Sequence, residues 1–277
     1  MVRGSGFACS NLLVTMEPSR RDTFDQVAEL YHEARPGYPG AVFDDVFSFA
    51  ALPPTAHLFE IGCGTGHATI EFARCGFAID CVELGPNLAD LARRNLASFP
   101  SVHIAVADFD SFTATSRYHL VYSASAYHWL NPATRIARIA ELLHPAGSIA
   151  IWRNHDIRGK RSARFHDAAQ AIYAAAAPDL ANKHDGATEL SQIPFTESEQ
   201  WLASGLFHDA QTRVYLWQRK YTAEEHVRVL DTYSDHRMLA ADARGKLFAG
   251  LRSLIKTRFS GSLTREFATI LQIARKR

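Results

Sequence analysis

The sequence predicts an α/β protein with a doubly wound, mostly parallel sheet of seven strands. From residue 56 onward, short apolar runs alternate with helical stretches, a pattern typical of parallel strands covered by helices on both faces. A glycine-rich segment joins the first apolar run to the first of these helices, as expected at the carboxyl edge of such a sheet. At 277 residues the chain has room for one large domain with an elaborated cap.

The N-terminal region is expected to contain a leader followed by two helices. Residues 1–22 are predicted to be a flexible leader, since their apolar stretch is too short and broken for a signal peptide, and Met16 is an alternative start. Residues 23–50 have helical spacing in two pieces, separated by a turn over 35–40. That turn contains two prolines and two glycines, and proline disfavours helix in the residue before it.

The seven strands are expected where apolar runs are bounded by turn residues. They are residues 57–61, 78–82, 102–106, 120–122, 148–152, 214–217 and 267–273. The helices between the first five are predicted over residues 67–74, 86–98 and 132–143. One domain is therefore predicted over 23–277, with its core at about 50–155 and 206–277. A helical cap is expected at about 156–205, inserted between the fifth and sixth strands and joined by the N-terminal helices.

Three helix starts have recognisable capping residues. Asn131 followed by Pro132 suits the start of the helix over 132–143. Thr196 with Glu199, and Thr222 with Glu225, have the spacing of capping boxes. We expect these two pairs to open the helices that flank the sixth strand.

The composition argues against several binding partners and cellular locations. Thirty basic residues and twenty-nine acidic ones give a net charge of +1, so the protein as a whole has no positive electrostatic field that would attract nucleic acid. No apolar run is long enough to cross a membrane. The four cysteines (Cys9, Cys63, Cys75 and Cys81) form no CxxC pair, which fits a reducing compartment and hence the cytoplasm. The expected partner is a small-molecule acceptor, with no nucleic acid and no membrane, and the chain is expected to be a monomer or homodimer.

The segment Glu60–Gly66 is the most informative part of the sequence. Its glycines at 62, 64 and 66 follow the first strand and open a helix, where they allow a tight turn and close approach of a ligand. Such a loop is a weak signal alone, because a tight turn without any ligand has the same composition.

Acidic residues at two further strand ends strengthen this signal. Glu83 ends the second strand, where a carboxylate can accept hydrogen bonds from both ribose hydroxyls of a nucleoside. Asp108 follows the third strand and can accept a hydrogen from an adenine amino group, with Phe109 able to stack on the ring. Either acid alone is equally well explained as a cap or a solvated charge, but three such features at successive strand ends indicate a nucleoside site.

With these motifs the chain resembles the class I S-adenosylmethionine-dependent methyltransferases. Glu60–Gly66 resembles their first motif, and Tyr122–Ala124 falls where a later motif belongs. A finer resemblance is to small-molecule enzymes of the trans-aconitate methyltransferase type (methyltransferase type 11), through the turn Arg35–Pro39 and the pair His128–Trp129. The resemblance is firm over residues 24–155 and holds only in outline over 205–277.

This resemblance implies S-adenosyl-L-methionine as cofactor. The glycine loop would face its methionine part, Glu83 its ribose and Asp108 its adenine, while Tyr31 and Arg35 would close over it from the N-terminal side. The implied cofactor-binding residues are Tyr31, Arg35, Glu60, Gly62, Cys63, Gly64, Gly66, Glu83, Leu84, Asp108, Phe109 and Ser123.

Two other functions fit the same fold. A nicotinamide dinucleotide enzyme with the GxGxxG fingerprint would need glycine at position 67, where this chain has His67. A protein that binds S-adenosylmethionine without transferring its methyl group is the non-enzymatic alternative. No histidine or cysteine spacing for a metal is present.

Methyl transfer is expected to proceed by in-line displacement to an O-, N- or C-nucleophile, a carboxylate among them. The protein's main task is then to position the acceptor. His128 is the candidate general base where the acceptor must lose a proton, because it follows the fourth strand at the carboxyl edge. The alternative for His128 is that it only orders its loop.

Overall fold

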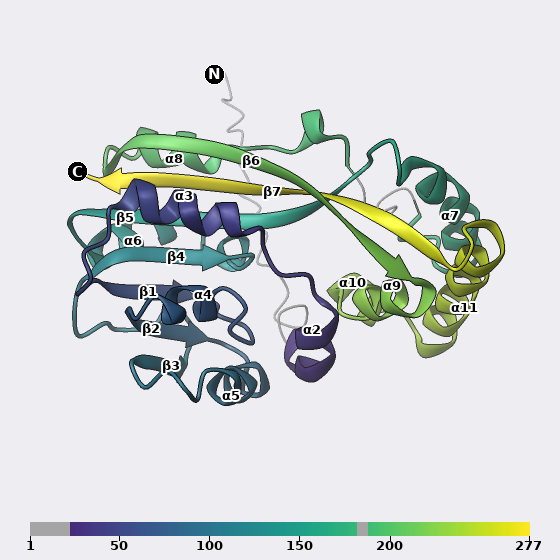
Figure 1. Ribbon diagram of the computed structural model, residues 1–277, viewed down its shortest axis with the longest axis horizontal. Helices are drawn as coiled ribbons and strands as arrows, with labels where there is room; N and C mark the ends of the chain where they lie inside the picture. Colours follow the sequence, from purple (N-terminus) through teal and green to yellow (C-terminus); the bar gives the residue numbers. More distant parts are fainter. Residues whose placement is uncertain (1–22, 182–187) are drawn as a thin grey trace, which may run out of the picture.

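The computed structural model describes residues 23–181 and 188–277, and its seven strands form one sheet (Figure 1). The strands are β1 (His57–Ile61), β2 (Ala78–Glu83), β3 (Val102–Val106), β4 (Tyr118–Ala124), β5 (Leu143–Ile157), β6 (Phe207–Thr222) and β7 (Ser262–Lys276). Their order is β3-β2-β1-β4-β5-β7-β6. The first five are parallel, and β7 is antiparallel to both β5 and β6. The predicted mostly parallel, seven-stranded α/β fold is confirmed.

Helices cover both faces of the sheet. They are α2 (Ala28–Ala34), α3 (Gly40–Ala50), α4 (Thr69–Arg74), α5 (Pro86–Asn95), α6 (Arg135–Leu142), α7 (Ala163–Ala176), α8 (Glu197–Ala203), α9 (Ala223–Leu230), α10 (Ser234–Arg237) and α11 (Ala241–Arg258). Apolar side chains of α3 and α4 pack on one face, and those of α6 and α8 on the other. The central strands β1 and β4 are therefore buried almost throughout, as parallel strands usually are.

The cap is built around the outer halves of β5, β6 and β7, which extend well past the rest of the sheet (Figure 1). Helices α7, α9 and α11 share one apolar cluster at this end. Helix α7 lies between β5 and β6 in the chain, as predicted, whereas α9 and α11 lie between β6 and β7. Helix α8 packs on the sheet instead, with Trp201 fully buried.

One predicted helix start and one predicted capping box are wrong. Helix α6 begins at Arg135 rather than 132, because the Asn131 side chain accepts a hydrogen bond from the Ala133 N–H and closes a turn before the helix. Thr196 precedes α8 but makes no capping hydrogen bond, since its backbone is helical (φ −101°, ψ −9°) rather than extended.

The capping box at Thr222 is confirmed. Its hydroxyl accepts from the Glu225 N–H at 3.2 Å, and its own N–H donates to the Glu225 carboxylate at 2.8 Å. This box starts α9 immediately where β6 ends, and so fixes the turn from sheet to cap.

No helix in residues 23–181 and 188–277 is long and apolar enough to cross a membrane. The leader predicted for residues 1–22 lies outside the described residues.

Candidate active site

The glycine-rich loop between β1 and α4 forms one wall of a cavity at the carboxyl edge of the sheet. Gly62, Gly64 and Gly66 have φ angles of +69°, +56° and +89°, which residues with side chains rarely adopt. A Cβ on Gly62 would lie 2.4 Å from that of Ala126, whereas one on Gly64 would meet only Tyr31, at 3.9 Å. The loop thus needs glycine for its conformation and for its approach to the segment after β4.

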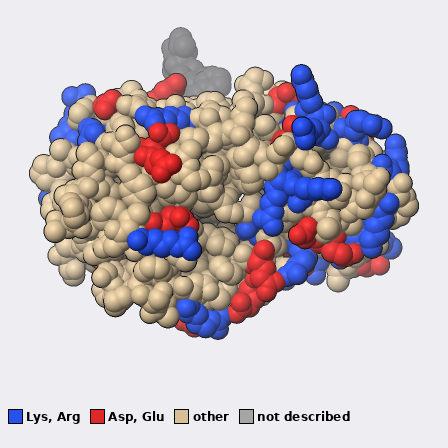
Figure 2. Space-filling model, in the orientation of Figure 1, with Lys and Arg blue, Asp and Glu red and all other residues tan. Residues whose placement is uncertain are grey.

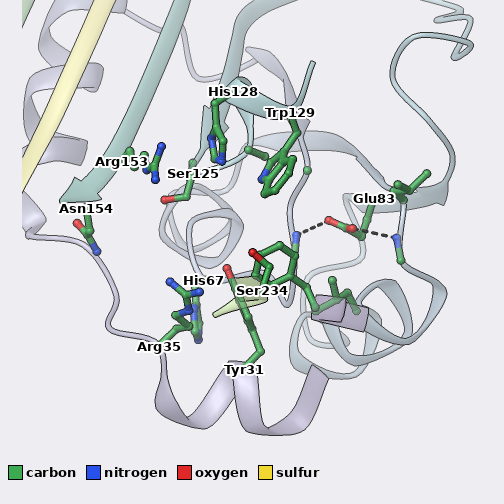
Figure 3. Close-up of a pocket in the computed structure, with 18 of the residues that line it drawn as sticks. Tyr31, Arg35, His67, Glu83, Ser125, His128, Trp129, Arg153, Asn154 and Ser234 are labelled. Carbon is green, nitrogen blue, oxygen red and sulfur yellow. Dashed lines mark hydrogen bonds between the residues drawn. The ribbon is translucent and has the colours of Figure 1, made fainter. Parts of the chain in front are cut away.

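Glu83 is held beside this loop by two backbone N–H groups. Its Oε2 accepts from Gly64 at 2.8 Å and its Oε1 from Gly85 at 3.0 Å (Figure 3). Burial raises the pKa of this carboxyl group, and the backbone hydrogen bonds oppose the rise. Because each carboxylate oxygen has two lone-pair sites, both oxygens can accept one further hydrogen bond from a ligand.

The cavity between sheet and cap has a volume of about 700 Å³, within the range of about 300–1,000 Å³ that small-molecule pockets occupy. Figure 2 shows it as a hollow between the two halves of the molecule, with basic side chains on its cap side. Eight of the residues predicted from the sequence line it: Tyr31, Arg35, Gly62, Gly64, Glu83, Leu84, Phe109 and His128.

The other five predicted residues (Glu60, Cys63, Gly66, Asp108 and Ser123) do not line the cavity. Glu60 is buried under the loop, where its Oε2 accepts hydrogen bonds from the hydroxyls of Thr69 at 2.6 Å and Tyr122 at 2.9 Å. Burial raises the pKa of Glu60 to about 7. The Ser123 hydroxyl donates to the carbonyl of Ile61.

Cys63 is buried in the loop, and Gly66 and Asp108 lie at turns. Gly66 packs against α5, where an added Cβ would lie 2.9 Å from Leu96. Asp108 accepts a hydrogen bond from the Asp110 N–H, while Ala107 and Phe109 on either side of it line the cavity. The strand ends therefore meet at one edge, as predicted, although not every side chain there faces the cavity.

Arg35 closes the cavity from the N-terminal side. Its guanidinium lies between the rings of Tyr31 and Tyr233, with its Cζ 5.3 and 4.3 Å from their centroids. Its Nε donates to the Thr232 hydroxyl at 2.8 Å, which ties the turn after α2 to the cap. Arg35 thereby joins sheet, N-terminal helix and cap around one space.

His128 lies on a short 3-10 helix, Tyr127–Trp129, directly after β4, and lines the cavity. Burial, followed by the charge of Arg153, lowers its pKa from the ordinary value to about 3. Its imidazole is therefore neutral at physiological pH. A base works best with a pKa near the operating pH, so His128 is well placed but weakly basic.

Sequence reasoning missed three consecutive cavity residues, Arg153, Asn154 and His155. They belong to the outer half of β5, which was expected to end at Trp152. A signal was present, since the residues following a parallel strand lie at the same edge as Gly62 and Glu83.

Known proteins with similar sequences are methyltransferases. Residues 58–147 match a family model described as a methyltransferase domain. An uncharacterised methyltransferase from Mycobacterium tuberculosis is 28% identical over 148 residues, which are 52% of this chain and 58% of that protein. The trans-aconitate 2-methyltransferase of Deinococcus radiodurans is 30% identical over 37% of this chain and 40% of its own length. The chain thus spans 58% of the length of the first relative and 40% of the second.

Solved structures share the fold. Phosphoethanolamine N-methyltransferase 2 of Haemonchus contortus, in complex with S-adenosyl-L-methionine, superposes with a TM-score of 0.52 at 18% identity. The superposition covers 91% of this chain and 57% of that one. At this identity the likeness concerns the fold alone.

Proposed function

Because this chain belongs to the class I S-adenosylmethionine-dependent methyltransferases, we propose that it transfers a methyl group from this cofactor to a small-molecule acceptor. The observation that carries the proposal is the arrangement of the positive-φ glycine loop and the Glu83 carboxylate on one wall of a 700 Å³ cavity. Cys63, Cys75 and Cys81, the cysteines within the described residues, are free, which supports a reducing, cytoplasmic location.

The residues on the sheet side of the cavity fit this cofactor. Gly62 and Gly64 present backbone without a Cβ toward it, and Glu83 has lone pairs open to two ribose hydroxyls. Leu84 and Phe109 offer an apolar wall for adenine. His67 occupies the position where a dinucleotide fingerprint has its third glycine, which favours a cofactor without a pyrophosphate.

The acceptor is then bound on the cap side. When bound, the cofactor supplies a methyl group on a positively charged sulfur and leaves as a neutral thioether. Tyr38, Ser125 and His128 also line the cavity, and we propose that they orient the acceptor. Holding two reactants in line can contribute about 7–11 kcal/mol to lowering a barrier, so positioning is the protein's principal contribution.

His128 fits an orienting role better than that of a base. With a pKa of about 3 it holds a proton poorly near neutrality, whereas its neutral ring can still donate one hydrogen bond and accept another. We therefore propose that His128 orients the acceptor beside Trp129, whose ring lies 4.8 Å away.

A transfer screen tests this function. Small acids, phenols and amines are incubated with the protein and S-adenosylmethionine, and S-adenosylhomocysteine is measured through a homocysteine-coupled assay. Turnover on a class of small molecules is expected. If S-adenosylhomocysteine binds but no acceptor is methylated, the chain is a non-catalytic binding protein, and the proposal of transfer is wrong.

A further inference from the structure

Asp25 lies in the segment before α2 and binds the start of a helix far along the chain. Its Oδ1 accepts a hydrogen bond from the Leu88 N–H at 2.9 Å, and its Oδ2 accepts one from the Asn87 side chain at 2.9 Å. Leu88 is the third residue of α5, whose N–H is the one that an N-cap side chain usually satisfies. Asp25 therefore supplies the N-cap contact of α5, although it lies 63 residues before Leu88.

Gly85, the residue at the N-cap position itself, has no side chain to make this contact. Its backbone is extended (φ −80°, ψ 117°), a conformation open to any residue, so the turn does not require glycine. A Cβ at Gly85 would lie 2.5 Å from Oδ1 of Asp25. The space that the Asp25 carboxylate occupies thus explains why glycine fits at this position.

The same turn holds the Glu83 carboxylate. Gly85 donates its N–H to Oε1 of Glu83 at 3.0 Å, and α5 begins directly after Gly85. The residues that make these contacts line one part of the cavity: Asp25, Glu83, Gly85 and Leu88. The N-cap contact of Asp25 therefore lies beside the carboxylate that we propose binds the ribose.

The segment that carries Asp25 bridges the sheet and the cap. Helix α2 lies between α5 on the sheet side and α9 on the cap side (Figure 1). Phe24 and Tyr31 line the cavity and pack on apolar side chains of α5. The Tyr31 ring also faces the glycine loop, since a Cβ on Gly64 would lie 3.9 Å from it. The segment can cover a cofactor beside Glu83 only while it stays packed on α5.

We infer that Asp25 is a positioning residue for the cofactor. Through its N-cap contact with α5 it keeps the N-terminal segment closed over S-adenosylmethionine and steadies the turn that orients Glu83. This inference rests on the proposed function. The apparent affinity of a ligand decreases with the fraction of protein whose site is competent to bind. Loss of the N-cap contact should therefore weaken cofactor binding as well as stability.

Binding of S-adenosylhomocysteine to Asp25→Ala tests the inference. An N-cap side chain contributes about fivefold to an equilibrium constant. We expect the variant to bind S-adenosylhomocysteine about fivefold more weakly in isothermal titration and to release it faster in stopped-flow displacement. Asp25→Asn should bind within twofold of the parent protein, because its amide oxygen can still accept from the Leu88 N–H.

Gly85→Ala is a second, independent variant. It keeps the carboxylate but places a methyl group 2.5 Å from Oδ1 of Asp25, so it should weaken binding about as much as Asp25→Ala. In the Asp25→Ala protein that methyl group has room, and adding Gly85→Ala should change the affinity by less than twofold. If the two residues only stabilised the fold, this coupling would be seen in the melting temperature and not in the affinity.

Glu29→Ala is the matched control, because Glu29 joins the same segment to Arg94 near the end of α5 through an exposed ion pair. It should bind S-adenosylhomocysteine like the parent protein.

Three results would overturn the inference while leaving the proposed function intact. They are an affinity of Asp25→Ala within twofold of the parent, an equal loss in Asp25→Asn, and additive effects of the Asp25 and Gly85 substitutions. If Asp25→Ala does not fold, an unchanged affinity of Gly85→Ala overturns the inference instead. Failure of the parent protein itself to bind S-adenosylhomocysteine would refute the proposed function.

Discussion

Replacing Glu83 by glutamine should weaken cofactor binding by at least tenfold while the fold survives. The carboxylate accepts N–H groups from both Gly64 and Gly85, at 2.8 and 3.0 Å. An amide has only one oxygen, so its NH₂ group must face one of these donors or the ribose. A hydrogen bond to a charged group contributes about 1.5–3 kcal/mol, and about 1.4 kcal/mol corresponds to tenfold in affinity. Loss of a single ribose contact therefore predicts a decrease of about ten- to a hundredfold.

The assay is isothermal titration with S-adenosylhomocysteine, together with the melting temperature of each variant. Glu224→Gln is the control, since that exposed acid pairs with Arg252 and Lys256 on the cap surface. An affinity within threefold of the parent, in a folded Glu83→Gln protein, would show that Glu83 only fixes the loop and does not bind the ribose.

Three more predictions follow from the same geometry. Gly62→Ala should destabilise the protein more than Gly76→Ala. Both positions have positive φ, so both variants carry backbone strain of about 1–3 kcal/mol, but only at Gly62 would the added Cβ lie 2.4 Å from Ala126. Equal decreases in the free energy of unfolding, measured in urea, would contradict this prediction. His128→Asn should lower turnover by less than tenfold. Because the pKa of His128 is about 3, the pH–rate profile between pH 5 and 8 should have the same shape in the variant as in the parent protein. A limb of that profile near pH 6.5 that is present in the parent and absent from the variant would identify His128 as a base. Acid should destabilise the cap through His226, whose pKa is held well below its ordinary value by burial and then by Arg265. In the unfolded chain His226 takes up a proton near pH 6.5, whereas in the folded protein it stays neutral. The free energy of unfolding therefore keeps its full value above that pH and decreases by up to about 1.4 kcal/mol per pH unit below it. His226→Gln should lessen the difference in urea unfolding between pH 7.5 and pH 5, and an unchanged difference would refute this linkage.

The inner strands could be predicted from the sequence almost to the residue. β1 and β3 coincide with the predicted ranges 57–61 and 102–106, because each is a short apolar run bounded by turn residues. β5 and β6 run to 15 and 16 residues, far beyond the predicted 148–152 and 214–217. Their outer halves carry polar side chains toward the cavity and solvent, so hydrophobicity alone could not reveal them.

The site was predictable on its sheet side and not on its cap side. The positions of the glycine loop and Glu83 could be predicted because both stand at the ends of strands, and a parallel sheet brings these ends to one edge. Arg153 and Tyr233 come together only through the pairing of β5 with β7 and the return of the chain after β6. No local pattern contains that information. Likewise, Thr196 and Thr222 have the same capping spacing, but only Thr222 has the extended backbone that lets its side chain cap the helix.

The most direct test of the account is competitive titration of the parent protein with S-adenosylhomocysteine and NAD. The positive-φ glycine loop, the open lone pairs of Glu83 and the presence of His67 in place of a third glycine predict one site that binds S-adenosylhomocysteine. NAD should neither bind measurably at millimolar concentration nor displace the first ligand. Binding of NAD with no binding of S-adenosylhomocysteine would contradict the account and place the cavity with the dinucleotide enzymes.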